Sequence, residues 1–159
     1  MNTWPLQSKC DEFYGNPRGN GGTVCPKWFD ENIVHVKVPF AMHMGSDKIW
    51  SISIHRKCAA SLLTVLQRVT TPILQRNDPK DNEFDGSFCF RKMRGGNNLS
   101  MHSWGCAIDL DAANNPFGSH KFRFTADHPW VKEFKAEGWT WGGEWTSPDA
   151  MHFQAARVR

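Results

Sequence analysis

The C-terminal third of the chain limits the possible folds most strongly, because it contains short alternating segments separated by turn residues. Apolar and polar side chains alternate in Trp139-Thr140-Trp141 and again from Ala150 to Gln154, with Gly142-Gly143 and Ser147-Pro148 between them. Strands this short, joined by turns, favour an antiparallel sheet, since parallel strands need a crossover of a dozen or more residues. An antiparallel sheet is therefore expected.

Further strands are expected earlier in the chain. Residues Ile33 to Phe40 alternate along their length, and Ile49 to Ile54 resemble them. The polar stretch Arg76 to Gly86 is typical of a loop. Ser87 to Arg91 then predict a short strand that brings Arg91 towards the middle of the molecule.

Helices are expected in three places. Residues Leu6 to Phe13 predict a short helix, and Lys57 to Val69 predict the best-defined one, since apolar residues recur there at helical spacing and Pro72 marks a stop. The third helix has Asp127 as its N-cap and Gly138 just past its end.

The length of 159 residues fits one domain, so we expect residues 1–159 to form a single α+β fold with a central antiparallel sheet flanked by helices. No apolar run approaches the roughly 18 residues of a membrane helix, so no membrane insertion is expected. Residues 1–10 lack the apolar segment of a secretory signal, which predicts synthesis in the cytoplasm. Five cysteines without a Cys-x-x-Cys pair are expected to be reduced and mostly buried.

The net charge is +3, and the basic residues are dispersed along the chain. This pattern does not predict a nucleic-acid interface. A positive surface would favour approach to an anionic polymer such as a bacterial cell wall, but a surface that merely keeps the protein soluble accounts for the same charge.

Candidate chemistry is concentrated in the segment from Ser100 to Asp109. It places His102 and Asp109 seven positions apart around Gly105, where the backbone can turn or pack closely. On a strand that begins near Cys106, the side chain of Asp109 points into a cleft while its neighbours pack in the core. His102 then has to fold back to meet Asp109.

A second candidate segment runs from Asp149 to Gln154. Met151 and Phe153 alternate with His152 and Gln154, so His152 faces the cleft while its apolar neighbours enter the core. Asp149 lies at the start of this strand. If His152 binds a metal ion, Asp149 is close enough in sequence to approach a water molecule on that metal.

Two histidines and one carboxylate are the ligand set of a catalytic zinc ion that keeps a position open for water. His102, Asp109 and His152 are therefore the candidate ligands. Zinc lowers the pKa of its water, and Asp149 is the candidate base that accepts the proton, with Glu144 as its rival. Arg91 is the candidate donor to a developing oxyanion.

The other histidines and the tryptophans of this region have simpler interpretations. Isolated imidazoles usually serve packing or surface hydrogen bonds, and His128 is expected on the surface of a helix. The tryptophans are expected in the core or in the wall of the cleft. The residues concerned are His35, His43, His55 and His120, together with Trp104, Trp139, Trp141 and Trp145.

The two segments together resemble a known family. The pattern Ser-x-His-x-x-Gly-x-Ala-x-Asp, followed by Trp-Gly-Gly-x-Trp and Asp-x-Met-His-Phe, resembles the D-alanyl-D-alanine carboxypeptidase family of zinc peptidases, and most closely its L-alanyl-D-glutamate endopeptidase branch, which includes phage endolysins. Phe90-Arg91 and Arg94-Gly95 also match the pattern of this family. Glu144 departs from the pattern, since many relatives have aspartate there.

The resemblance implies a compact α+β fold with Zn2+ bound by His102, Asp109 and His152. It implies that Asp149 is the base and that Arg91 steadies the substrate or the oxyanion. It further implies cleavage of the stem peptides of bacterial peptidoglycan. Because only six residues follow Phe153, no separate wall-binding domain is expected. The lack of a secretory signal predicts a protein that is made in the host cytoplasm and reaches the wall after release, and a monomer is expected. Removal of terminal D-alanine and a non-catalytic zinc domain are the alternatives.

Overall fold

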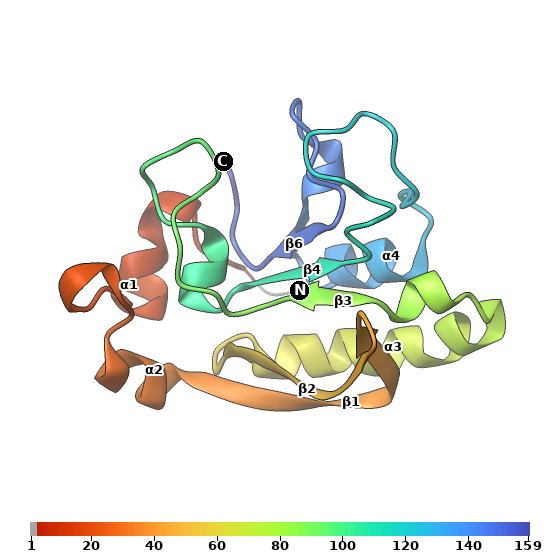
Figure 1. Ribbon diagram of the computed structural model, residues 1–159, viewed down its shortest axis with the longest axis horizontal. Coiled ribbons are helices and arrows are strands. Elements are labelled where there is room, and N and C mark those ends of the chain that lie inside the picture. Colours follow the sequence, from red (N-terminus) through yellow and green to blue (C-terminus); the bar gives the residue numbers. More distant parts are fainter. Residues whose placement is uncertain (1–2) are drawn as a thin grey trace.

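The computed structural model describes residues 3–159, which form four α-helices and two antiparallel sheets (Figure 1). The helices are α1 (Cys10–Tyr14), α2 (Pro26–Asn32), α3 (Ala59–Arg76) and α4 (Pro129–Ala136). The strands are β1 (Ile33–Met44), β2 (Asp47–His55), β3 (Phe84–Gly86), β4 (Ala107–Leu110), β5 (Thr140–Trp141) and β6 (His152–Gln154). The expected α+β class is confirmed.

The two sheets lie in different parts of the molecule. β1 and β2 form a long hairpin that packs against α3, and α3 in turn packs against α4. The other sheet has the strand order β3-β4-β6-β5 and lies at the centre of the molecule. Figure 1 shows the segments around residues 88–100 and 112–124 rising from the same side of this sheet.

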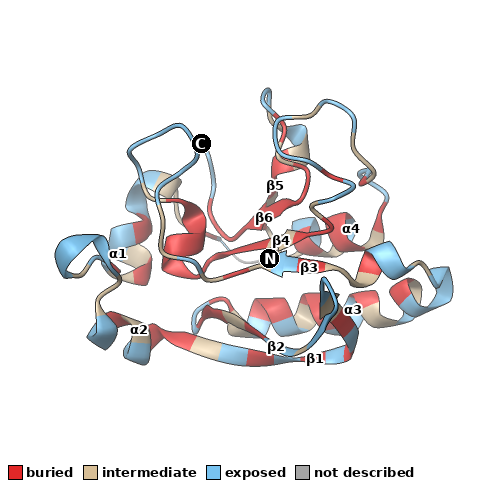
Figure 2. Cartoon of the chain, viewed as in Figure 1, coloured by how far each residue is buried: buried red, intermediate tan, exposed pale blue. Residues whose placement is uncertain are grey.

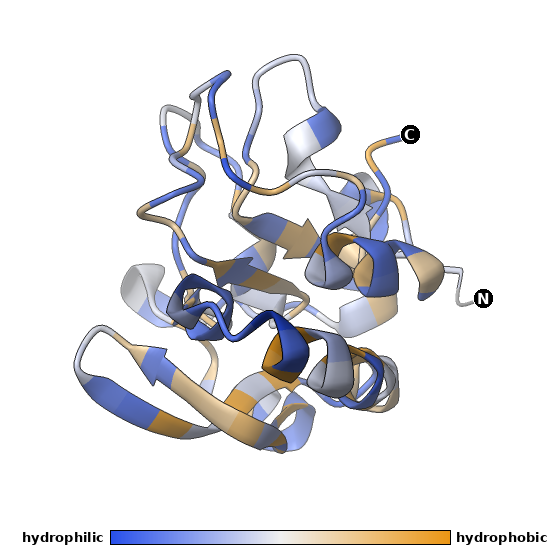
Figure 3. Cartoon of the chain, turned by 90° about the vertical axis from the view of Figure 1, so that its right-hand side faces the viewer, coloured by the Kyte–Doolittle hydropathy of each residue, from blue (hydrophilic) through white to orange (hydrophobic). Residues whose placement is uncertain are grey.

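The core lies between these layers (Figure 2). One face of α3 is buried at helical spacing, through Leu62, Val65, Leu66 and Val69. Figure 3 shows strongly hydrophobic segments on the strands and helices in the interior, whereas the outer loops are mostly hydrophilic or neutral. Burying these apolar faces is the main favourable contribution to folding.

Helix α3 is longer than the sequence predicts, because Pro72 lies inside it and does not end it. A proline inside a helix removes one backbone hydrogen bond. The following residue, Ile73, is 1% exposed, and its burial holds the chain on the core. The helix ends instead at Arg76, where Asn77 caps it with a left-handed backbone (φ 51°) and an N–H that donates to the carbonyl of Ile73.

Two other predictions about local structure are wrong. The cap of α4 is His128, whose Nδ1 accepts a hydrogen bond from the N–H of Trp130, and not Asp127. His128 is also buried and not on the surface, because its Nε2 contacts the carboxylate of Asp81 at 2.7 Å. The gain of a charged hydrogen-bond partner offsets the cost of burying the imidazole.

The strand expected at Ser87 to Arg91 is also misplaced. The paired segment is β3, three residues earlier, where Phe84 is buried opposite Leu110 of β4. Ser87 to Arg91 are irregular backbone instead. The helix expected at Leu6 to Phe13 begins as a 3₁₀ turn (Gln7–Lys9) and continues as α1.

Candidate metal centre

The centre is built where β4 and β6 pair. Asp109 and His152 are directly opposite in the antiparallel register, so their side chains leave the same face of the sheet as neighbours. The flanking Ile108 and Phe153 also pair, and both are buried in the core on the other face. The strand alternation predicted from sequence is therefore what aims the carboxylate and the imidazole at one point.

His102 reaches the same point from a 3₁₀ turn, η4 (Met101–Trp104), that precedes β4. Gly105 ends this turn with φ at 69°, a left-handed conformation that favours glycine. A Cβ atom at Gly105 would also lie 2.6 Å from Cδ1 of Ile33. The glycine therefore permits both the reversal and the close packing that bring His102 back over the sheet.

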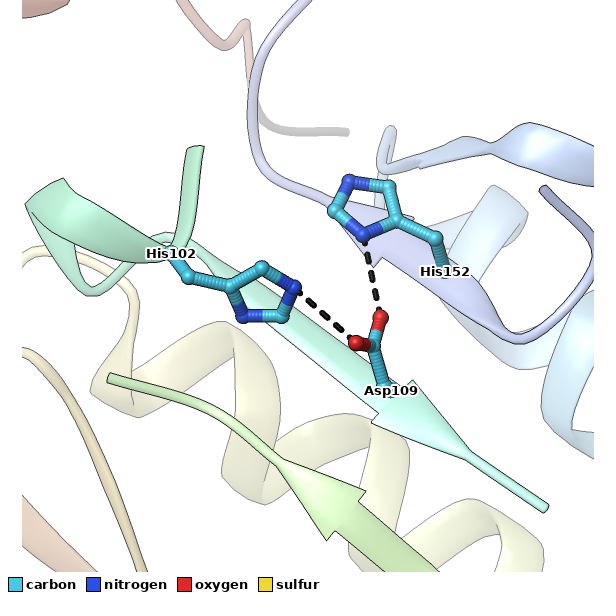
Figure 4. Close-up of side chains that lie close together, drawn as sticks. All are labelled: His102, Asp109 and His152. Carbon is cyan, nitrogen blue, oxygen red and sulfur yellow. Dashed lines mark hydrogen bonds and ion pairs between the residues drawn. The ribbon is translucent and has the colours of Figure 1, made fainter. Parts of the chain in front are cut away.

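The three side chains converge (Figure 4). Nε2 of His102 lies 3.1 Å from one carboxylate oxygen of Asp109, and Nδ1 of His152 lies 3.0 Å from the other. One donor atom from each residue lies within 4.8 Å of the other two. Both imidazoles are buried, so the donors face one another in a site with little solvent.

The second nitrogen of each imidazole is held by a protein acceptor. Nδ1 of His102 donates to the carbonyl of Ser87 at 2.6 Å, and Nε2 of His152 donates to Oε1 of Gln154 at 2.8 Å. The amide of Gln154 is itself oriented, because its Nε2 donates to Gln7 and to the carbonyl of Ala156. These contacts leave a lone pair on His102 Nε2 and another on His152 Nδ1, directed into the site.

The electrostatics fit a shared cation. Burial works against the charged form of Asp109, but hydrogen bonds and charges from His102 and His152 hold its pKa well below its usual range. Burial also works against a charged His152, yet the hydrogen bond and charge of Asp109 raise its pKa. The carboxylate is thus favoured in its charged form, and its charge is the main reason that the pKa of His152 is raised.

Asp149 stands beside this group. Its Oδ2 is 4.0 Å from Nδ1 of His152, and its Oδ1 is buried with no hydrogen-bond partner among residues 3–159. The backbone of Asp149 packs directly on Gly142, where a Cβ atom would lie 2.3 Å from the carbonyl of Asp149. Burial raises the pKa of this carboxyl. A buried carboxylate with a free lone pair and a raised pKa suits a general base.

Glu144, the rival base, lies elsewhere. Its carboxylate forms an ion pair with Lys135 on the surface, and its side chain is 52% exposed. It does not line the pocket that contains the donor group.

The pocket has a volume of about 290 Å³ and lies directly over the donor group. Arg91, Arg94 and Asp149 bring charges to its wall. Its apolar lining comes from Met93, Phe117, Trp145, Met151 and Val158. The pocket therefore suits an extended ligand that has both polar and apolar groups.

Arg91 reaches the pocket from a firmly held backbone. Its N–H donates to Oγ of Ser103 at 3.1 Å, and the hydroxyl of Ser103 donates to its carbonyl at 2.9 Å. Ser103 follows the metal-site residue His102, so the position of Arg91 is coupled to the donor group.

Sequence reasoning did not assign a role to Ser103 or Gln154, and it noted Arg94 only as part of a resemblance. Ser103 carried no spacing signal, because it acts through the tertiary contact with Arg91. Gln154 could have been recognised from its position two residues after His152 on the same face of the strand.

The remaining predicted residues behave as expected for packing. His55 is fully buried between Tyr14 and Trp28, and burial lowers its pKa to about 4. Trp104, Trp139 and Trp141 are buried, and Trp145 lies against His152 with ring centroids 5.8 Å apart. The five cysteines are free, and Cys10, Cys58 and Cys106 are buried.

Two imidazoles with fixed tautomers and a carboxylate form a possible metal site, and a buried carboxylate and two arginines lie beside it. A comparison with family models agrees with this interpretation. Residues 94–155 match the family described as D-alanyl-D-alanine carboxypeptidase, and the matched segment contains His102, Asp109, Asp149 and His152. The match supports a peptidase. Searches of curated proteins and of solved structures found no match.

The helices of residues 3–159 include none that is long and apolar enough to cross a membrane.

Proposed function

We propose that the protein is a zinc-dependent peptidase that hydrolyses the L-Ala–D-Glu bond in the stem peptides of bacterial peptidoglycan. The observation that carries this proposal is the convergence of His102 Nε2, His152 Nδ1 and the Asp109 carboxylate beside Asp149. The family match over residues 94–155 supports the peptidase chemistry.

The donor set fits zinc. Nε2 of His102 is buried and forms no hydrogen bond of regular geometry among residues 3–159, although it lies 3.1 Å from the Asp109 carboxylate. A lone pair that faces an acceptor is costly unless a cation lies between them. Two nitrogens and one carboxylate are the three protein ligands typical of a catalytic zinc ion, and they would leave room for a water molecule. When bound, the zinc ion acidifies a water molecule and polarises the scissile carbonyl.

The protein groups around the donor set supply the remaining chemistry. Asp149 accepts a proton from the attacking water through its free Oδ1 and then delivers it to the leaving amine. The guanidinium of Arg91 donates to the oxygen on which negative charge develops. The hydrogen bonds with Ser103 hold the backbone of Arg91, and one guanidinium N–H donates to the carbonyl of Lys92, so the side chain starts from a fixed base.

The choice of bond rests on the motifs shared with L-alanyl-D-glutamate endopeptidases. The second candidate is removal of terminal D-alanine, which the description of the matched family favours. Both reactions can use one metal site, because each hydrolyses an amide on the amino side of a D-amino acid.

Mass spectrometry of muropeptides separates the candidates. Zinc-loaded protein is incubated with purified peptidoglycan of the directly cross-linked, D-glutamate-containing type, and new amino termini are identified. Cleavage between L-Ala and D-Glu is expected, whereas loss of one D-Ala would establish the second candidate. His102→Ala and Asp149→Asn serve as controls, and equal product from wild type and both variants would exclude a metallopeptidase.

A further inference from the structure

Two arginines line the pocket, and neither has a carboxylate partner among residues 3–159. Arg91 uses one guanidinium N–H to donate to the carbonyl of Lys92, and Arg94 has no ion pair in this part of the chain. Their two charges offset those of Asp109 and Asp149, so a bound divalent cation would leave the pocket positive. An anionic substrate is therefore favoured.

The two arginines are held in different ways. Arg91 lies at the base of a small hairpin, where Lys92 pairs with Leu99 and the backbone of Arg91 is fixed to Ser103. Arg94 lies in the turn at the tip of this hairpin, followed by Gly95 at φ 72°. Arg91, with its backbone held, suits stabilisation of the transition state. Arg94, at the tip of the hairpin, suits contact with a part of the substrate away from the reacting atoms.

The guanidinium of Arg94 is placed across the pocket from its own hairpin. Its Cζ atom lies 5.1 Å from the ring centroid of Phe117, which belongs to the loop on the other side. Contact with an aromatic face orients a guanidinium but leaves its N–H groups in the plane free to donate. Arg94 therefore presents a preorganised fork of donors to the pocket.

Arg94 lines the same pocket as Asp149. Its positive charge acts on Asp149, where it opposes the rise in pKa that burial causes. Asp149 is the group that protonates the leaving amine in the proposed function. A substrate anion held by Arg94 would then belong to the residue that carries this amine.

The proposed substrate has such an anion. D-glutamate in the stem peptide is linked onward through its γ-carboxyl, so its α-carboxylate is free and is separated from the scissile nitrogen by one carbon. A terminal D-alanine has the same arrangement of amine, Cα and free α-carboxylate. A single carboxylate subsite would therefore serve both candidate reactions.

Resting on the proposed function, we propose that Arg94 binds the α-carboxylate of the D-amino acid on the leaving side of the scissile bond. The enzyme then discriminates against stem peptides in which this carboxylate is amidated. A carboxamide cannot form the bidentate, charge-assisted contact that a guanidinium makes with a carboxylate.

The test uses two synthetic stem peptides that differ only in carrying D-glutamate or its α-amide, D-isoglutamine. The wild type is expected to favour the free acid by about 10- to 100-fold in kcat/KM, the size of a charge-assisted hydrogen bond. Arg94→Gln should lose this preference, mainly through a higher KM for the free acid, while its rate on the amide changes little. Arg94→Lys should retain part of the preference.

Lys92→Gln is the matched control, because it removes a charge from the same hairpin at an exposed position that does not line the pocket. It should keep the wild-type preference. A second pair of peptides, ending in D-Ala-D-Ala with a free or an amidated C-terminus, shows which carboxylate is bound.

The possible failures are distinguishable. Equal wild-type rates on acid and amide, or an Arg94→Gln variant that loses the same factor on both, would overturn the carboxylate subsite while leaving the peptidase intact. If the zinc-loaded wild type cleaves none of the four peptides, the proposed function itself fails.

Discussion

Nε2 of His152 donates a 2.8 Å hydrogen bond to Oε1 of Gln154, two residues further along β6 on the same face. The contact fixes the tautomer of His152, so that Nδ1 faces Asp109. His102 is fixed by the carbonyl of Ser87 in the same way. The metal centre is therefore oriented by an amide and a backbone carbonyl that do not themselves belong to the donor group.

Replacing Gln154 should weaken zinc binding without unfolding the protein. Gln154→Leu keeps the size of the side chain but removes the acceptor for His152, so we expect zinc affinity to fall by about 10- to 100-fold. Competition with a chromophoric chelator measures this. Gln7→Ala, which removes only a partner of Gln154, should have a smaller effect, and unchanged affinity in Gln154→Leu would exclude the positioning role.

Zinc binding should weaken as the pH falls. Metal and protons compete for the two imidazoles, and the pKa of His152 in the metal-free protein is raised above its usual value of about 6.5. Affinity is therefore fully present above this raised pKa and declines as the pH falls through it. Equilibrium dialysis with zinc analysis at a series of pH values gives the curve, which should move to lower pH in Gln154→Leu as a support of the charged imidazole is removed.

Gly105→Ala should destabilise the fold. The new Cβ would meet Ile33 at 2.6 Å, in addition to the cost of a left-handed backbone for alanine, and we expect a loss of about 2 to 4 kcal/mol in unfolding free energy. Urea denaturation measures it. Gly118→Ala is the control, because Gly118 also has a left-handed backbone (φ 76°) but no atom within 4 Å of the added Cβ. It should lose only about 1 kcal/mol, and equal losses would argue against the contact with Ile33.

The buried carboxylate of Asp81 should control acid stability. It contacts Arg76, Arg123 and His128, and although burial opposes its charge, these partners hold its pKa well below the usual range. Its contribution is present above the unfolded pKa of about 3.9 and is lost as the pH falls towards the folded value.

Asp81→Asn should therefore cost about 3 to 5 kcal/mol at neutral pH and flatten the fall in stability below pH 4. Unfolding followed by circular dichroism across this range tests both effects. Asp11→Asn breaks only an exposed ion pair with Arg18 and should cost less than about 1 kcal/mol. If stability falls below pH 4 in Asp81→Asn just as it does in the wild type, other carboxylates cause the fall.

Ser103→Ala should separate catalysis from metal binding. Losing the hydroxyl frees the backbone of Arg91, so we expect kcat on a stem peptide to fall by about tenfold while zinc affinity stays the same. Activity and chelator competition measured on one preparation distinguish the two. A parallel loss of zinc would show that Ser103 acts on its neighbour His102 instead.

Much of the site could be predicted from local patterns. Alternation in β4 and β6 places Asp109 and His152 on the sheet face opposite their apolar neighbours, and a short strand has only two faces to choose between. Gly105 marked the turn that returns His102. Pro72 was wrongly predicted to end a helix, because the burial of Ile73 outweighs the local effect of the proline. Asp127 was wrongly predicted as the N-cap, because His128 takes that place and is held there by its contact with Asp81.

The sequence by itself determined the antiparallel α+β class and placed Asp109 and His152 on one face of the sheet, because both follow from side-chain periodicity within short segments. The turn at Gly105 and the position of Asp149 before the last strand predicted the other two residues. Only the tertiary structure decided which groups surround them. Ser87 fixes the tautomer of His102, Ser103 holds the backbone of Arg91, and the guanidinium of Arg94 packs against the ring of Phe117. Each of these depends on the distance and direction between atoms of different segments, which the order of residues along the chain does not specify.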